Sequence, residues 1–179
     1  MVADLSIFSE VKNLANEVNN LGNFDVIIHN AGIFHESNEE ILKVNVLAPY
    51  ILTVLINKPK KMIYIGSNMH SQGKINLDKI SLGVDYSTSK LLILMFSFSV
   101  SKVWSDVCVN SVGPGWIKTK MANYNAPNSL DDGTQTQLWL TTDENMKESG
   151  KYFFHLKELG FSEKALDNEH QNKLLELYF

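Results

Sequence analysis

A tyrosine and a lysine stand four positions apart in the segment "YSTSK", as Tyr86 and Lys90, and together they could move a proton. Residues at i and i+4 of a helix lie on one face, one turn apart. A free phenol has a pKa of about 10, too high for a base near neutral pH, and a nearby ammonium group lowers that pKa by favouring the phenolate. The spacing therefore indicates a general acid/base. The plain alternative is a half-buried helix tyrosine beside a solvated lysine.

Three further segments place small or polar residues directly after short apolar runs: "HNAG" at 29–32, "GSNMH" at 66–70 and "GPGWIKT" at 113–119. In a parallel α/β sheet, ligands bind outside the carboxyl ends of the strands. If each apolar run is a strand, these segments converge on one rim with the start of the helix that carries Tyr86. We therefore expect a small-molecule site at that rim.

The periodicity of apolar residues predicts the elements that carry these segments. Helical spacing predicts helices over 5–22, 38–56 and 86–104, with Asn38 as the N-cap of the second. Continuous apolar runs within 24–32, 60–67 and 107–115 are typical of parallel strands covered on both faces. Strands that alternate with helices indicate an α/β fold, with a parallel sheet and helices on both of its faces.

The pattern is weaker after residue 120. We expect a loop over 123–133, then a helix, a short strand within 149–155 and an amphipathic C-terminal helix over 163–179. A length of 179 residues fits one domain. We therefore assign residues 1–179 to a single domain, in which residues 120–179 form the substrate loop and the C-terminal segment.

The composition excludes several classes of function. The net charge is -4 and all 16 basic residues are lysine, which leaves no basic surface for nucleic acid or anionic membrane and no bidentate arginine clamp. The single cysteine cannot form a disulfide within the chain, and the histidines lack metal-ligand spacing, so we predict no metal site. We expect His35 and His70 on surface loops. Acidic residues interrupt the first ten positions, and the longest apolar run, 91–100, is too short to span a bilayer, so we expect a cytoplasmic protein.

Five segments in order carry a resemblance to a known family: "HNAG", "VNVLAPY", "YIGS", "YSTSK" and "NSVGPGWIKT". Together they resemble the short-chain dehydrogenase/reductase family, over residues 4 to about 154. The segments "GSNMHSQGKINLDKI" and "GTQTQLWLTT" are similar to its retinol-dehydrogenase-like branch. The resemblance implies a Rossmann-like fold and an NAD- or NADP-dependent oxidoreductase. Such an enzyme transfers hydride between the nicotinamide cofactor and a small alcohol or carbonyl substrate.

The resemblance also implies a role for individual residues. Tyr86 would be the general acid/base, and Lys90 would lower its pKa and hold the nicotinamide ribose. Ser67 would hydrogen-bond the substrate oxygen, and Asn45 would keep a water molecule in a proton relay. Plain alternatives are a turn or cap serine at position 67 and a satisfied polar group at position 45. The other implied cofactor contacts are Asp4, which would meet the adenine, and Asn30, Ala31, Gly32, Pro114, Gly115, Ile117 and Thr119.

One part of the family pattern is missing from these residues. The family binds the pyrophosphate with a Gly-rich turn after its first strand. The only Gly-x-Gly here is Gly113 and Gly115, and Lys118 stands where a third glycine would follow. We therefore expect an N-terminally truncated fold that lacks the first two strands, in which the "HNAG" strand is an exposed edge. Its first residue, His29, replaces the usual asparagine, which puts one structural hydrogen bond in doubt.

Two functional hypotheses follow. One is an active oxidoreductase with Asn45, Ser67, Tyr86 and Lys90 as its catalytic set. The other is a catalytically inert remnant or assembly subunit in which cofactor binding is lost. A sugar-nucleotide epimerase shares Tyr-x-x-x-Lys, but "GPGWIKT" and the short C-terminal part do not resemble that class. Because helices 38–56 and 86–104 are apolar over much of their surface, we expect a homodimer or a larger homo-oligomer.

Overall fold

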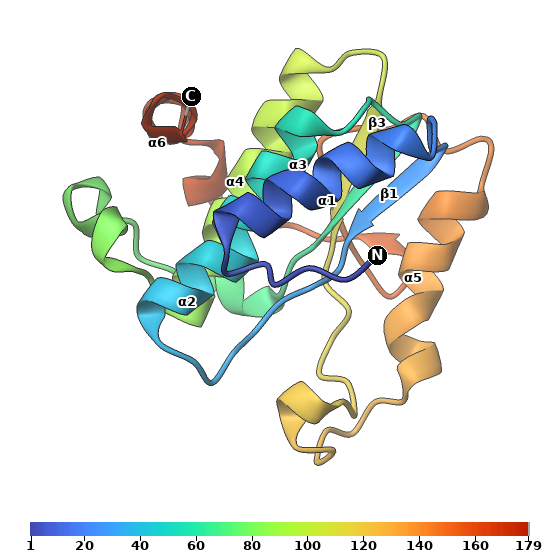
Figure 1. Cartoon of the computed structure of the whole chain (residues 1–179). Coiled ribbons are helices and arrows are strands. Elements are labelled where there is room, and N and C mark those ends of the chain that lie inside the picture. The colour runs from blue at the N-terminus through green and yellow to red at the C-terminus, as the bar shows by residue number, and fades with distance from the viewer. Residues whose placement is uncertain (179) are drawn as a thin grey trace.

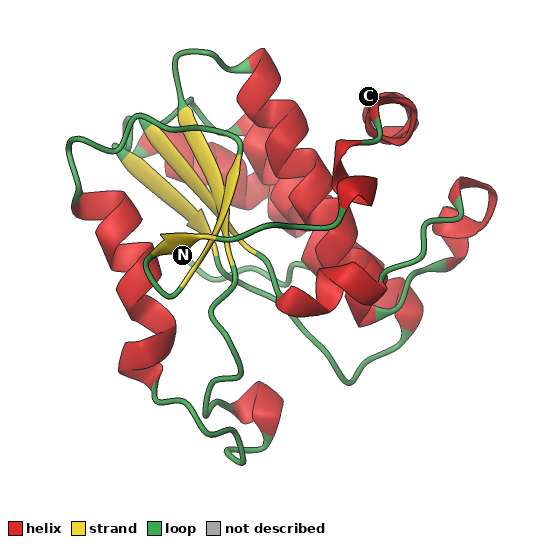
Figure 2. Ribbon diagram, turned by 180° about the vertical axis from the view of Figure 1, so that it is seen from behind, coloured by secondary structure: helices red, strands yellow, loops and turns green. Residues whose placement is uncertain are grey.

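The fold is a parallel sheet between two layers of helices (Figures 1 and 2). The computed structural model describes the backbone of residues 1–178, and side chains for all of these except positions 77 and 174–178. The five strands lie in the order β1-β2-β3-β4-β5, with β1 to β4 parallel and β5 antiparallel to β4. Their bounds are β1 Val26–His29, β2 Lys61–Ile65, β3 Cys108–Val112, β4 Lys151–Phe154 and β5 Lys157–Glu158.

Helical segments make most of the connections between these strands. The α-helices are α1 Phe8–Asn20, α2 Asn38–Leu42, α3 Ala48–Leu55, α4 Tyr86–Val103, α5 Leu130–Thr142 and α6 Asn168–Tyr178. The shorter turns are the π-helical η1 Lys43–Leu47 and the 3₁₀ segments η2 Asn68–Gln72, η3 Leu77–Leu82, η4 Lys120–Ala122 and η5 Glu163–Leu166. The predicted Rossmann-like α/β fold is confirmed.

Alternate residues of each strand point to opposite faces, and each face has its own helices. Met62 and Tyr64 of β2 pack with Phe96 of α4 on one face, where α3 also lies. Ile63 and Ile65 of the same strand pack with α5 on the other face. Helix α1 lies against α3 rather than on the sheet. Figure 2 shows α5 on one side of the strands and the other long helices on the opposite side.

Two details of the predicted 38–56 helix are wrong. The N-cap is Ser37, not Asn38, because the Ser37 side chain accepts a hydrogen bond from the Glu40 backbone N–H at 3.2 Å. The helix is also not continuous. Over η1 the backbone widens into a π turn, in which the Ala48 N–H donates to the Lys43 carbonyl. Such turns are frequent at functional sites.

Two boundaries near the C-terminus also differ from the prediction. Helix α5 starts within the predicted 123–133 loop, because Ser129 and Asp132 form a reciprocal capping box before Leu130. The predicted 163–179 helix divides into η5 and α6, because the Asp167 carboxylate accepts hydrogen bonds from the backbone N–H groups of Glu169 and His170 and so caps a new helix. The last residue of that prediction, Phe179, lies outside the described residues.

A row of polar side chains crosses the sheet on the face of α3 and α4. The residues are neighbours on adjacent strands: His29 on β1, Tyr64 on β2, Ser111 on β3 and Tyr152 on β4. The Nε2 of His29 lies 3.2 Å from the Thr53 Oγ1, and its ring stacks on Tyr64. The histidine at this position is therefore hydrogen-bonded. As predicted, β1 is an edge of the described sheet.

Candidate active site

Helix α4 begins at the carboxyl end of the sheet and brings Tyr86 and Lys90 there. The Asp85 side chain accepts a hydrogen bond from the Thr88 N–H at 2.7 Å, which fixes the helix start directly before Tyr86. One turn later, Lys90 is only 5% exposed, and its Nζ donates to the Ile65 carbonyl at the end of β2 at 2.8 Å. The Lys90 Nζ lies 5.5 Å from the centre of the Tyr86 ring. The two side chains thus share one helical face, as their spacing predicts.

Burial sets the protonation of both groups in this structure. Burial lowers the pKa of Lys90 to about 8. Burial also raises the pKa of Tyr86, and a hydrogen bond with the Ser67 side chain opposes that rise. The sequence-based expectation that Tyr86 has a lowered pKa is therefore not met here, because desolvation of the phenol outweighs its polar contacts. Tyr86 is therefore a protonated phenol at neutral pH in this structure.

Ser67 lies between β2 and η2 and serves as a cap. Its Oγ accepts a hydrogen bond from the Met69 backbone N–H at 3.2 Å. The same side chain also makes a hydrogen bond with the Tyr86 side chain. The cap role and the contact with Tyr86 therefore occur together.

The Asn45 side chain is committed to protein contacts. It is 2% exposed and lies in the π turn of η1. Its Oδ1 accepts from the Ile33 N–H at 2.8 Å, and its Nδ2 donates to the Ile33 carbonyl at 2.9 Å and to the Ser89 Oγ at 3.1 Å. Asn45 thus pins the loop after β1 to α4. The plain interpretation as a satisfied polar group holds for the side chain, so a proton relay at this position would have to use its backbone.

Gly32 lies directly beside the Asn45 and Lys90 side chains. A Cβ at this position would lie 3.2 Å from the Asn45 Oδ1 and 3.7 Å from the Lys90 Nζ. A side chain here would occupy the space next to the buried ammonium group. The missing Cβ therefore keeps a cradle in which a polar ligand can approach Lys90.

The other predicted cofactor residues are more scattered. Asn30 and Ala31 are exposed directly after β1. Pro114 and Gly115 follow β3, and Gly115 needs its φ of 91°. The loop then turns through Thr119, whose N–H donates to the Ile117 carbonyl at 2.8 Å.

Two members of the predicted set face other parts of the fold. Ile117 packs against Gly133 of α5, where an added Cβ would lie 2.7 Å from its Cγ1. Asp4 is exposed before α1, and its Oδ1 accepts hydrogen bonds from the N–H and Oγ of Ser6. The structure therefore brings together Gly32, Asn45, Ser67, Tyr86 and Lys90, and Asp4 has its hydrogen bonds within its own turn.

Sequence reasoning missed His70 and Tyr152, which lie close to the turn that begins at Ser67. His70 was expected on a surface loop and is 4% exposed, so that expectation is wrong. Tyr152 of β4 is fully buried and its hydroxyl donates to the Asn68 Oδ1 at 2.8 Å. The spacing of His70 three residues after Ser67 was the one available signal, because it places both residues on a single turn.

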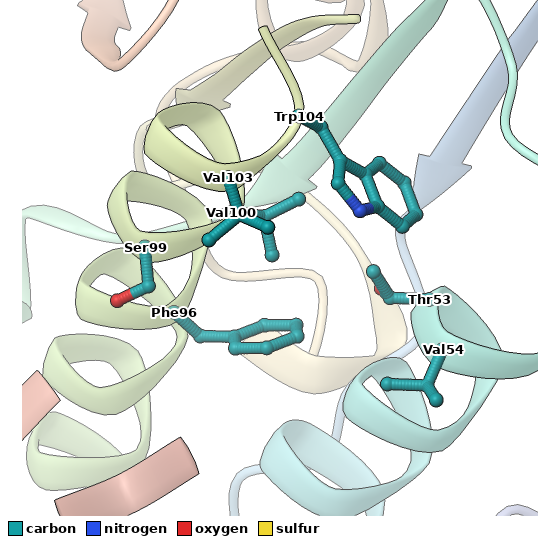
Figure 3. A pocket seen from close by; sticks show the side chains of 7 residues that line it. All are labelled: Thr53, Val54, Phe96, Ser99, Val100, Val103 and Trp104. Carbon is teal, nitrogen blue, oxygen red and sulfur yellow. The ribbon is translucent and has the colours of Figure 1, made fainter. Parts of the chain in front are cut away.

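A separate groove lies between α3 and α4 and has no ionisable lining. Figure 3 shows side chains from the two helices facing each other across it. Its volume is about 340 Å³, and its lining residues are Thr53, Val54, Phe96, Ser99, Val100, Val103 and Trp104. With no acid or base, this groove is no candidate for proton transfer.

The described residues show neither a metal-binding cluster nor a helix able to span a membrane. Among the side chains that the structure describes, no three or more histidine, cysteine, aspartate or glutamate residues form a cluster that could hold a metal ion. Among the helices of the same part of the chain, none has the length and apolar character needed to cross a membrane.

Known proteins match this chain in sequence and in fold. Residues 1–129 match the short chain dehydrogenase family. The short-chain dehydrogenase chyC of Penicillium rubens is 34% identical over 178 residues, which cover 89% of this chain and 69% of that protein. Retinol dehydrogenase 14 of Mus musculus is 26% identical over 191 residues, covering 86% of this chain and 57% of that protein.

A solved structure gives the same fold. The NADPH-bound carbonyl reductase from chicken fatty liver superposes with a TM-score of 0.72 at 20% identity, covering 89% of this chain and 75% of that one. The chain thus matches the family in sequence over residues 1–129 and has the fold of this solved structure. We conclude that it belongs to the short-chain dehydrogenase family.

Proposed function

We propose that this chain carries the proton-transfer site of an NAD(P)-dependent oxidoreductase acting on a small alcohol or carbonyl compound. The observation that carries the proposal is the buried Lys90, 5% exposed, with its Nζ 5.5 Å from the Tyr86 ring at the carboxyl end of the sheet. Burying an ammonium group costs free energy, and titratable groups with perturbed pKa values cluster at functional sites.

The residues present fit the nicotinamide end of such a cofactor. The Gly32 cradle opens beside the Lys90 Nζ, which uses one of its three donors on the Ile65 carbonyl. Lys90, Asn30, Ala31 and Gly32 would hold this end, together with the loop of Pro114, Gly115, Ile117 and Thr119. When bound, the nicotinamide supplies or accepts the hydride. The fit does not extend to the pyrophosphate, because residues 1–179 contain no Gly-rich turn for it.

The chain's own residues would handle the proton. Tyr86 would donate its phenolic proton to a carbonyl oxygen during reduction and take it back during oxidation. Ser67 would hydrogen-bond the same oxygen and orient it. A charged Lys90 would stabilise the phenolate left on Tyr86. Asn45 would act as a positioning residue, because its side chain holds the loop after β1 in place.

The second candidate is an inert chain or an assembly subunit. The observation that favours it is the absence of a Gly-rich phosphate turn in residues 1–179. Without that anchor, the chain alone would hold a nicotinamide cofactor weakly. Both candidates share the geometry around Tyr86, and they differ in whether this chain binds the cofactor.

A binding titration separates the two candidates. The purified chain is titrated with NADH and with NADPH while tryptophan fluorescence is followed; Trp116, 62% exposed beside the β3 loop, is the expected reporter. The oxidoreductase proposal predicts saturable binding in the micromolar range. Gly32→Ala should weaken it at least tenfold by filling the cradle, while Lys60→Met, at an exposed position directly before β2, should leave it unchanged. A lack of binding up to millimolar concentration supports the inert chain.

The assembly and location are also proposals. The groove between α3 and α4 is bordered by Val54 and Val103, which are 44% and 69% exposed. Exposed apolar surface of this kind is typical of protein–protein contacts, so we infer that two copies of the chain pair through these helices. The cytoplasm stays the predicted compartment.

A further inference from the structure

His70 joins two parts of the chain that lie far apart in sequence. Its Nδ1 lies 2.7 Å from the Ser67 carbonyl oxygen, within the turn that follows β2. Its Nε2 lies 3.2 Å from the backbone N of Ser162, which is 92 residues away in the chain. The imidazole is 4% exposed, so both contacts are made with little competition from water.

The two partners determine which form of the imidazole is present. A carbonyl oxygen can only accept a hydrogen bond, so Nδ1 must carry a proton to bond Ser67. A backbone N–H can only donate, so Nε2 must be unprotonated to accept from Ser162. The contacts are therefore satisfied together only by the neutral Nδ1–H tautomer. Burial lowers the pKa of His70, which favours the same neutral form. The Tyr152 ring of β4 packs edge-on against the imidazole and carries no charge at neutral pH.

The segment held by His70 consists of residues 159–165, which we call the C-terminal segment. Besides the Ser162 contact, the Lys164 Nζ donates to the Gly73 carbonyl at 3.1 Å. Phe161 packs its ring on Phe98 of α4. A hollow of about 390 Å³ remains between this segment and η2, next to Asn68. The segment therefore rests on both ends of the turn that begins at Ser67.

The same turn sets the direction of the Ser67 hydroxyl. The Ser67 carbonyl accepts from the His70 backbone N–H at 3.0 Å as well as from Nδ1. The Ser67 Oγ accepts from the Met69 N–H at 3.2 Å. If Nδ1 no longer held the carbonyl, the peptide after Ser67 could rotate and Oγ would lose its position relative to Tyr86.

We propose that His70 is a positioning residue, whose neutral Nδ1–H form ties the Ser67 turn to the C-terminal segment and thereby fixes the Ser67 hydroxyl. We call the two contacts of His70, with Ser67 and with Ser162, the clamp. The importance of Ser67 rests on the proposed function, whereas the clamp itself does not. The clamp couples the reacting end of the site to a segment that borders the hollow beside it. A change in the C-terminal segment would therefore be transmitted to Ser67.

Two substitutions separate the halves of the clamp. His70→Asn keeps a donor near the position of Nδ1 and loses the acceptor for Ser162. His70→Gln keeps an acceptor that reaches Ser162 and loses the donor for Ser67. His155→Asn is the matched control, because His155 is exposed at the β4–β5 turn with a φ of 47°, a conformation that asparagine tolerates.

The test uses NMR on the full chain without cofactor, so it does not depend on turnover. Imidazole ¹⁵N spectra should show one neutral Nδ1–H histidine that disappears in both His70 variants and stays in His155→Asn. Amide exchange at Met69, which reports the Ser67 Oγ, should rise at least tenfold in His70→Gln and stay near wild type in His70→Asn. Exchange at Ser162 should show the reverse order.

An Nε2–H tautomer, or equal exchange at Met69 in the two variants, would overturn the proposal. Equal acceleration at all amides in both variants would show a general loss of stability and would also reject a positioning role. If the titration with NADPH detects binding and turnover is found, kcat should fall about tenfold in His70→Gln with little change in KM, and much less in His70→Asn. A failure of binding with the exchange pattern intact would reject the proposed function and leave the clamp standing.

Discussion

Lys90 combines a functional position with a cost in stability. Its ordinary pKa of 10.5 falls to about 8 because the side chain is buried. Between these two values the unfolded chain binds more protons than the folded one, so the free energy of unfolding rises as the pH increases through this window. Below about pH 8 the cost of burying the charge is present in full. The charge that would stabilise a Tyr86 phenolate is thus kept against the preference of its surroundings.

This cost predicts a pH dependence that belongs to Lys90. From pH 7.5 to 9.5, wild type should gain about 2 kcal/mol in the free energy of unfolding relative to Lys90→Met, since each unit of pKa difference corresponds to about 1.4 kcal/mol. Urea unfolding at each pH measures the difference. Lys90→Arg is the control, because it stays charged throughout and should follow the pH profile of Lys90→Met. Parallel profiles for wild type and both variants would contradict the assignment.

The burial of His29 predicts that the free energy of unfolding falls at acidic pH. Burial lowers its pKa from 6.5 to about 4, so the folded chain binds fewer protons than the unfolded chain in this window. Its stabilising contribution is full above pH 6.5 and is lost as the pH falls towards 4. From pH 7 to 4.5, wild type should lose about 2 kcal/mol more than His29→Asn. Chemical unfolding at both pH values tests this, with His155→Asn expected to behave as wild type.

Among the elements, α5 depends on a lysine from the sheet. The Lys61 Nζ donates to three carbonyls at the end of α5, those of Leu140, Thr141 and Asp143, at 3.0, 3.3 and 2.7 Å. Helix C-termini have unpaired carbonyls and a partial negative charge that a cation satisfies. This contact ties β2 to the helix that covers its other face.

Lys61→Met should therefore lower the free energy of unfolding by about 1 to 2 kcal/mol. The neighbouring Lys60 provides a matched control. Its ion pair with Asp25 at 2.7 Å is exposed on both sides, and such pairs add little to stability, so Lys60→Met should unfold as wild type does. The measurement is urea unfolding of the three proteins at one pH. Equal losses in the two variants would show that a general charge effect, not the helix end, is responsible.

The elements also show what the sequence could and could not predict. Apolar periodicity predicts α1 and α4, and continuous apolar runs predict the first three parallel strands, because both are local patterns in the sequence. The π turn at Asn45 and the break at Asp167 come from hydrogen bonds that compete with a regular helix, which periodicity does not register. The burial of His70 has another cause. Its partner Ser162 lies 92 residues away, and no local pattern contains that contact.

In the predicted site, too, local spacing could be predicted from the sequence and the effects of packing could not. Tyr86 and Lys90 were found together because helical spacing places them on one face. The raised pKa of Tyr86 was not predicted, because it depends on how deeply α4 packs. Asn45 and Ser67 have the predicted positions, and their proposed roles stay predictions.

At the scale of the whole molecule, pairing through α3 and α4 is testable. Val103→Glu would place a charge at the groove of Figure 3 and should convert a dimer into a monomer by light scattering across protein concentrations. Leu82→Glu is the control, because Leu82 is 74% exposed on η3 and does not line the groove. A monomeric mass for wild type at every concentration would reject the pairing.

The polar row from His29 to Tyr152 also bears on how the strands find their alignment. Its members are adjacent across four strands, whereas the next residues along, including Val112 and Phe153, belong to the apolar layer under α5. A slip of one residue would turn each strand over, leaving hydroxyls and an imidazole against that apolar layer without partners. Misaligned sheets would therefore be penalised at every strand at once. The row thus selects a single register, and with it the one alignment that brings the strand ends level around Tyr86.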